Sequence, residues 1–480
     1  MGGGEDRFVP DRVPSQPQAE GDGPRGLPRD RRVLIFIVIA CALMMMSIDA
    51  TIVATALHAL ASDLDAPINW TGWTITAYWF GYVVMLPVSG RLAERFGHRR
   101  VFIASTLAFA LASLACALAQ HVALLVFFRA LQAIGGAGLT PAATGIVVAW
   151  FGASRDRVLG LFGAVFSVGA LIGPVFGGLF VTYASWRDVF FVNVPIGLAM
   201  ALLGLWLIPP DRAEECSRRR MDVPGMLLLG VAVIAGMLAA SVLGNTGVRV
   251  LSWPFLAPLG LALLAGWAFF RHIARVAEPF LPPRLIHGPG FAATNFLNAT
   301  YGGVISGAVT LVPLYAATRY GLSALDAATL LVAQGVVAFI LGPLAAWALR
   351  WSGYRWPFYV GGVLAGLGAL LLALEPRLGL SPWAWLALAS VFMGASGGVM
   401  GPASRNAALQ LVPDRAATMS ALRATAQELG VIIVLAVLTS AMAMGTDAAQ
   451  VLAMSYALLA LLSLALLPVV ARVPEHRGAW

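Results

Sequence analysis

The sequence predicts an all-α polytopic membrane protein with about fourteen transmembrane helices. Two observations lead to this class. The 480 residues are 59% hydrophobic and only 11% charged, which is more apolar surface than a soluble protein of this length can bury. The charged residues gather in short segments between apolar runs, and each run is long enough to span a bilayer as a helix.

The apolar runs divide the chain into two sets of six with two more between them. The first six expected spans cover residues 33–57, 73–89, 101–119, 122–148, 158–183 and 189–208. Two follow at 223–243 and 253–270, and the last six cover 291–317, 324–349, 356–374, 382–402, 416–444 and 451–470. The expected organisation is a disordered tail (1–30), a six-helix half (31–210), a linker with two extra helices (211–287), a second six-helix half (288–472) and a tail (473–480).

The positive charges predict how the chain lies in the membrane. The net charge is +8, and arginine supplies all of the fixed positive side chains. Arginines concentrate in alternate loops, for example at 91–100, 212–220 and 405–415, while each opposite loop carries one or none. Because arginine-rich short loops stay inside, we expect a multi-pass protein of the cytoplasmic (inner) membrane with both termini cytoplasmic. This clustering also argues against nucleic acid as a partner.

Sequence motifs for enzymatic chemistry are absent. There is no His-Glu-x-x-His and no Gly-Lys-Ser/Thr phosphate loop, and Cys41, Cys116 and Cys216 lie far apart without metal-ligand spacing. We therefore expect no enzyme, no cofactor, no metal and no disulfide framework. The missing phosphate loop argues against an ATP-driven pump. A sensor or scaffold that does not transport is a further class of protein to test.

A compact polar island at 90–100 lies between two long apolar runs. We expect a loop between two spans that contains Gly90, Glu94, Arg95, Gly97 and Arg99. The glycines allow a tight turn and a close approach of helices, and the arginines hold the loop inside. Glu94 is the only acid in the island, so we expect it to cap the helix that begins near Ala416 or to pair with an arginine.

The island reads Gly-x-Leu-Ala-acid-Arg-x-Gly-x-Arg-Arg and resembles the signature loop between the second and third helices of major facilitator superfamily transporters. Glu94 stands where that family usually has Asp, and the resemblance implies that Gly90, Glu94, Arg95, Gly97 and Arg99 form a gating loop. Segments beginning at Asp49, Arg129 and Ser185 resemble motifs of the fourteen-span drug:proton antiporter branch. The resemblance implies the major facilitator fold: two six-helix halves, two extra helices between them, and a substrate path between the halves.

The same resemblance implies a function in multidrug efflux and drug resistance. The expected activity is secondary active export of hydrophobic compounds, cationic ones among them, in exchange for protons. The alternative is an exporter of an endogenous metabolite or siderophore on the same scaffold. The expected partners are a small-molecule substrate, protons and the lipid bilayer, with a periplasmic adaptor as a further candidate, and we expect a monomer.

Glycines recur every fourth residue in the fifth expected span. Gly169, Gly173 and Gly177, with Pro174 beside them, lie in a segment similar to a motif associated with antiporters. Small residues at this spacing let two helices touch, and the proline permits a bend. We expect a tight seam between the two halves; the alternative is that glycine and proline are simply common in membrane helices.

Three charged residues are expected deep in the membrane, where charge is costly and faces a bundle interior or a polar cavity. Asp49 and Arg129 lie roughly 12 and 10 Å from the outer ends of their helices, at similar depth. We expect a proton-coupled pair; the alternative is a permanent structural ion pair. Glu428, roughly 18 Å into its helix, is the competing proton carrier, unless it makes a structural bond to Gln427 or a neighbouring helix.

A further set of polar and aromatic residues is expected to line the substrate cavity. Aromatic faces can hold an apolar or cationic substrate, although such residues more often serve packing or the membrane interface. The candidates are Trp73, Tyr78, Gln132, Asn295, Asn298 and Gln334.

Overall fold

The structure is a computed structural model that describes residues 27–66, 68–211, 221–243, 252–288, 290–377, 379–407, 409–444 and 448–475. Most of the expected N-terminal tail, the linker arginines at 212–220 with Cys216, and the chain after 475 lie outside the described residues. Within the described ranges every regular element is helical, as the sequence predicts.

The first helix group comprises the helices that precede the linker. They are α1 (Arg29–Asp63), α2 (Ile68–Phe96), α3 (His98–Ala117), α4 (Val122–Gly136), α5 (Leu139–Trp150), α6 (Arg155–Tyr183), α7 (Asp188–Phe191) and α8 (Asn193–Leu207). α9 (Val223–Leu243) and α10 (Trp253–Ile273) follow and pack on each other.

The second helix group follows α10. It contains α11 (Pro283–His287), α12 (Phe291–Gly302), a π-helical turn (Gly303–Gly307), α13 (Ala308–Thr310), α14 (Val312–Tyr320), α15 (Ala324–Ser352), α16 (Arg355–Ala373), α17 (Pro382–Asn406), α18 (Ala416–Met444), α19 (Ala448–Ala465) and α20 (Leu467–Val470). Ser323 and Ser381 begin α15 and α17, since their hydroxyls accept the backbone N–H of Asp326 and Ala384.

The helices are long and apolar enough for a multi-pass membrane protein. Among the described residues, twelve helices pass by length and composition, or thirteen if the bent pair Phe291–Thr310 and Val312–Tyr320 is one span. α2 has 29 residues but is not in this set, because its first half is rich in threonine, tryptophan and tyrosine. The expected number of about fourteen spans is therefore approximate.

Each group has its own helix packing. In the first group α1 packs on α6, α2 on α4 and α3 on α8; in the second, α17 packs on α15 and α16, and α16 on α19. One buried apolar cluster, from Leu297 to Val473, belongs wholly to the second group. Between the groups α2 packs on α18, and α6 packs on α15 and α17, while α9 also contacts α2 and α18.

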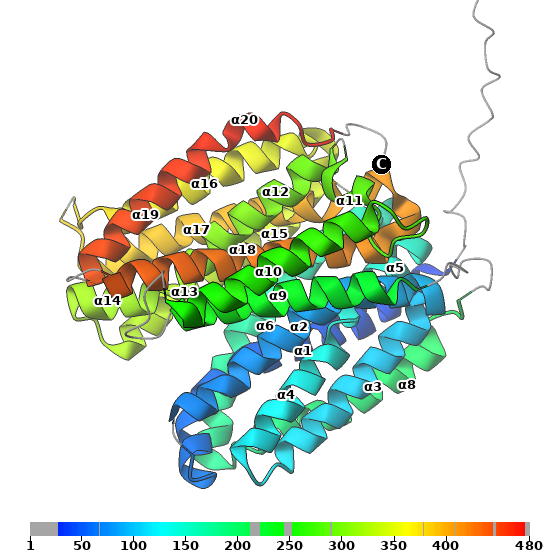
Figure 1. Cartoon of the computed structure of the whole chain (residues 1–480), viewed down its shortest axis with the longest axis horizontal. Helices are drawn as coiled ribbons and strands as arrows, with labels where there is room; N and C mark the ends of the chain where they lie inside the picture. Colours follow the sequence, from blue (N-terminus) through cyan, green and yellow to red (C-terminus); the bar gives the residue numbers. More distant parts are fainter. Residues whose placement is uncertain are drawn as a thin grey trace, which may run out of the picture.

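The bundle has two ends that differ in how the groups meet. We call the end with the α2–α3 turn at Gly97 and the α17–α18 connection the Gly97 end, and the opposite end, where α1 stops at Asp63, the Asp63 end. Figure 1 shows the two groups converging near α5 and α11 at the Gly97 end and separating toward the other end.

Candidate functional site

A buried polar cluster around Asp49 lies inside the first group. Asp49 is 0% exposed and Arg129 1% exposed, and Nη1 of Arg129 donates to Oδ2 of Asp49 at 2.6 Å. Nε2 of Gln132 and Nδ2 of Asn193 donate to Oδ1 of Asp49 at 2.8 and 2.9 Å. The carboxylate therefore accepts three hydrogen bonds and faces a fixed positive charge, so both charges are paired where water is absent.

The rest of the cluster fixes Arg129 from several helices. Its Nη1 also donates to Oε1 of Gln132 at 2.6 Å, and its guanidinium lies over the ring of Tyr78, 4.3 Å from the ring centre. The hydroxyl of Ser113 accepts from Gln132 at 2.5 Å and from Asn193 at 3.3 Å. α1, α2, α3, α4 and α8 thus each contribute a side chain, so the cluster ties the first group together.

Sequence reasoning missed two members of this cluster, Asn193 and Ser113. Asn193 stands in a segment quoted for its family resemblance, but no role was given to it. The available signal was a single amide in an otherwise apolar run, because an amide within a membrane needs a partner. Ser113 gave no comparable signal, since serine satisfies its hydroxyl readily within its own helix.

The expected substrate cavity remains a prediction. Tyr78 and Gln132 are 2% and 0% exposed and are engaged with Arg129, so they do not line an open cavity in this structure. The ring face of Tyr78 is already occupied by a cation and is closed to a cationic substrate here. Trp73 is 40% exposed on α2, and Gln334 is partly exposed on α15.

The two asparagines of α12 make bonds within the second group. Nδ2 of Asn295 donates to the carbonyl of Leu285 in α11 at 3.0 Å. Nδ2 of Asn298, which is buried, donates to the carbonyl of Arg423 in α18 at 2.7 Å. These contacts tie α12 to its neighbours and do not reach the Asp49 cluster.

Glu428 has a different setting from Asp49. It is half-buried on α18 and makes no hydrogen bond or ion pair within the part of the chain that the structure describes. The expected structural bond to Gln427 is not formed, because Oε1 of Gln427 accepts from Nη1 of Arg423 at 2.9 Å. Glu428 interacts electrostatically with Arg423 on its own helix and with Tyr82 of α2, across the boundary between the two groups.

Glu94 joins the two groups at the Gly97 end. It is 7% exposed, and its Oε1 accepts the backbone N–H of Thr418 at 3.1 Å, in the first turn of α18. Nη1 of Arg91 lies 3.4 Å from Oε2 of Glu94. The helix cap and the arginine pairing, which the sequence predicts as alternatives, are both present in the structure; the carboxylate lies where the α18 dipole is positive.

The groups also touch closely around Glu94. A methyl group at Gly90 would lie 2.7 Å from Cβ of Ala421 and 2.8 Å from the carbonyl of Ala417, so only glycine fits where α2 crosses α18. Four further hydrogen bonds join the groups at this end: Thr144 to Ser420 at 2.9 Å, Arg155 to Gln410 at 2.8 Å, Gln410 to Asp156 at 3.0 Å, and Asn406 to the carbonyl of Asp156 at 3.2 Å.

The turn between α2 and α3 depends on Gly97 and Asp211. Gly97 has φ 99°, a conformation that favours glycine, and the Asp211 carboxylate lies against its Cα. The backbone N–H groups of Arg99 and Arg100 donate to Asp211 at 3.1 and 3.2 Å, so this carboxylate caps α3. Sequence reasoning placed Asp211 in a linker and missed this role. Arg95, also expected in this loop, has its guanidinium over the ring of the adjacent Phe96.

The glycine seam has a different partner from the one expected. A methyl group at Gly169, Gly173 or Gly177 would meet Ser47, Thr51 and Thr55 in turn, all on α1, at 2.6, 2.0 and 2.0 Å. The seam therefore joins α6 to α1 inside the first group, and the expected seam between the two halves was wrong. The physical reason is that α1 repeats small hydroxyl residues at the same spacing of four, which accept the glycine face. α6 is continuous through Pro174.

Comparisons with known proteins agree with this architecture. A family model described as Major Facilitator Superfamily matches residues 37–220 and 225–435. The chain is similar to the tetracenomycin C resistance and export protein of Streptomyces glaucescens, with 30% identity over 73% of this chain and 64% of that protein. It therefore spans just under two thirds of that relative's length.

Two other relatives are covered more fully. A multidrug resistance protein B homolog of Mycobacterium tuberculosis is 31% identical over 82% of this chain and 73% of its own length. The puromycin resistance protein of Streptomyces alboniger is 32% identical over 84% of this chain and 80% of its own length.

Solved structures with the same fold include two transporters. The human organic anion transporter MFSD10 has a TM-score of 0.66 and 17% identity, covering 92% of this chain and 100% of that one. The proton:xylose symporter XylE has a TM-score of 0.66 and 15% identity, covering 94% and 97%. With a family model that matches most of its length, this chain belongs to the major facilitator superfamily of membrane transporters.

Proposed function

We propose that this protein is a secondary active transporter that exports hydrophobic drugs or toxic compounds across the cytoplasmic membrane in exchange for protons. The names of its relatives support export as the direction: one is a resistance and export protein, and two are resistance proteins. The observation that carries proton exchange is the presence of two carboxyl groups, Asp49 and Glu428, inside the helix bundle.

Carboxyl groups at this depth are costly unless they serve a path for ions or substrate. The two acids differ in what they can do in this conformation. Asp49 is held by Arg129 and two amides, so it must exchange these partners before it can take a proton. Glu428 interacts electrostatically with Arg423 but makes no hydrogen bond or ion pair within the described residues. On this basis we assign proton coupling to Asp49, Arg129 and Glu428, with Glu428 the acid that is free to take a proton in the conformation seen here.

The orientation of the protein is part of the same proposal. The Gly97 end carries the arginines that flank the α2–α3 turn and Arg415 in the α17–α18 connection, so we assign it to the cytoplasm. The contacts of Glu94 and Gly90 then close the cytoplasmic side. Alkaline phosphatase fused after the α3–α4 turn should be active, and fused in the α2–α3 turn it should be inactive.

The test of proton exchange is dye uptake into proteoliposomes under an imposed proton gradient. Purified wild-type protein should accumulate a hydrophobic dye against its gradient when the lumen is acidic. Accumulation should disappear when an uncoupler dissipates the gradient. Uptake that persists without the gradient would remove proton coupling from the proposal.

Variants in the same assay assign the proton to an acid. Glu428→Gln and Asp49→Asn should abolish uphill uptake but retain exchange of dye down its gradient. Asp63→Asn is the matched control, because Asp63 lies on α1 like Asp49 but is exposed at the helix end. If Asp49→Asn still accumulates dye and Glu428→Gln does not, the second group alone carries the proton.

A further inference from the structure

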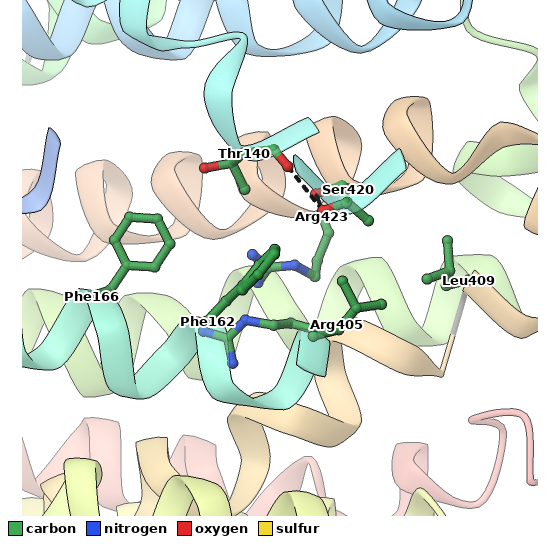
Figure 2. Close-up of a pocket in the computed structure, with 9 residues that line it drawn as sticks. Thr140, Phe162, Phe166, Arg405, Leu409, Ser420 and Arg423 are labelled. Carbon is green, nitrogen blue, oxygen red and sulfur yellow. Dashed lines mark hydrogen bonds between the residues drawn. The ribbon is translucent and has the colours of Figure 1, made fainter. Parts of the chain in front are cut away.

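Two arginines of the second group meet in a small cavity between the groups. Arg405 comes from the end of α17 and Arg423 from α18, and both line a cavity of about 20 Å³. Figure 2 shows both side chains extending toward Phe162 of α6. The hydrogen bond between Thr144 and Ser420 crosses beside them. The cavity is large enough for about one water molecule, so it is closed in this conformation.

Arg405 reaches across to the first group. A methyl group added at Gly163 of α6 would lie 2.8 Å from Nη1 and 3.0 Å from Nη2 of Arg405, so the guanidinium rests directly on the α6 backbone. The sequence placed Arg405 in a loop at 405–415, but the structure places it inside α17. Because its guanidinium is held between two helix groups, Arg405 is not one of the exposed loop arginines that set the orientation of the chain in the membrane.

The cavity holds positive charge without an acid. None of the 9 residues that line it is an acid, and Arg405 makes no hydrogen bond or ion pair within the described residues. Arg423 donates to the neutral amide of Gln427, and it interacts electrostatically with Glu428, which does not line the cavity. The remaining lining residues are neutral: Phe162, Phe166, Leu159 and Leu409 are apolar, and Thr140, Thr144 and Ser420 contribute hydroxyl groups. Two guanidinium groups that share a small cavity without an ion pair are costly, and an anion bound between them would reduce that cost.

We infer that Arg405 and Arg423 bind the oxyanion group, a carboxylate or phosphate, of an amphipathic organic substrate. A guanidinium presents a planar fork of donors that fits two oxygens, and Phe162 and Phe166 supply an apolar surface beside it. The cavity opens when the groups separate at the Gly97 end, which is the side where an exporter takes up its substrate. This assignment rests on the proposed function and adds acidic compounds to its substrates.

The test compares two probes that share the same apolar part: one carries a free carboxylic acid, and the other carries its methyl ester. The probes are 11-(dansylamino)undecanoic acid and its methyl ester, with the protein in phosphatidylcholine nanodiscs so that no anionic lipid competes. Wild-type protein should bind the acid about tenfold or more tightly than the ester, since a hydrogen bond to a charged group has at least that effect. Arg405→Gln and Arg423→Gln should each lose most of this preference while ester binding stays unchanged.

Matched variants distinguish three effects: loss of the positive charge, loss of the planar guanidinium geometry and loss of folding. Arg405→Lys should restore part of the preference, because it keeps the charge but loses the fork. Arg319→Gln should leave the preference intact, because Arg319 pairs with Glu375 at the other end of the bundle. Unchanged ester binding in the glutamine variants shows that they are folded.

Two results would overturn the inference. The first is equal affinity for acid and ester in the wild-type protein. The second is thermal stabilisation by inorganic phosphate alone that equals stabilisation by the acid probe, which would mean that the site takes a free anion. Failure of the proposed function would give a different result, because proteoliposomes would then accumulate no dye under any gradient. The ratio of the affinities for the acid and the ester would still decide the role of the arginines.

Discussion

Replacing Asp49 by asparagine tests whether the buried charge cluster stabilises the protein as the structure indicates. All three groups that contact Asp49 are donors: Nη1 of Arg129, Nε2 of Gln132 and Nδ2 of Asn193, at 2.6 to 2.9 Å. In Asp49→Asn one oxygen becomes an NH₂ group that faces a donor, and Arg129 loses its counter-charge at 1% exposure. Removing one partner of a buried ion pair costs about 3–5 kcal/mol, so we expect a loss of this size in unfolding free energy.

The assay is reversible unfolding of the purified protein by sodium dodecyl sulfate in mixed micelles. Asp63→Asn is the control, because it makes the same change on the same helix and also breaks an ion pair with an arginine, Arg187, at 2.5 Å. The Asp63 side chain is 47% exposed, and an exposed pair is worth at most about 1 kcal/mol.

A double-mutant cycle then isolates the pair. Arg129→Gln alone leaves a buried carboxylate, whereas Asp49→Asn with Arg129→Gln leaves neutral amides that can bond to each other. We expect the double variant to be more stable than the sum of the single losses predicts, by about 2 kcal/mol or more. Equal losses for Asp49→Asn and Asp63→Asn, or strictly additive losses in the cycle, would refute the reasoning.

Three further predictions follow from contacts of the first group. Gly177→Ala should lower the unfolding free energy by about 1–3 kcal/mol because its methyl group overlaps α1, whereas Gly178→Ala should cost little because nothing lies within 4 Å; equal losses would argue against the seam. Glu94→Gln should slow transport at normal expression, because the closed Gly97 end loses about 1–2 kcal/mol of charge–dipole attraction, and normal efflux would refute the role. The hydrogen bond from Arg187 lowers the pKa of Asp63 below 3.8, so the stability difference between wild type and Asp63→Asn should persist at neutral pH and vanish as pH falls through that lowered pKa; a difference that grows on acidification would contradict this.

The sequence was sufficient to predict elements that depend on local composition. Apolar run length placed helices close to their observed bounds, because backbone groups inside a membrane must bond within their own helix. The lone acid in the island at 90–100 led to the contact of Glu94 with α18, since a single carboxylate among arginines near a helix start has few partners. The pairing of Asp49 with Arg129 followed from similar depth.

What the sequence could not supply was the identity of neighbours in space. The spacing of Gly169, Gly173 and Gly177 marks a face that another helix must approach, but not which helix; the answer depends on Thr51 and Thr55, more than a hundred residues away. Arg405 was assigned to a loop because composition does not show where α17 ends. Its contact with Gly163 requires the packing of the two groups.

The closed Gly97 end combines attraction and repulsion between the two groups. Glu94 draws α2 toward the start of α18, while Arg405 and Arg423 place two positive charges in one cavity. On the assignment made above, an acidic substrate enters while the Gly97 end is open, and its negative charge then reduces the repulsion between the two arginines that opposes closing. A ligand shifts such an equilibrium only by its differential affinity for the two states. An exporter needs this sign of coupling, because substrate taken up from the cytoplasm must close the Gly97 end before the Asp63 end can release it.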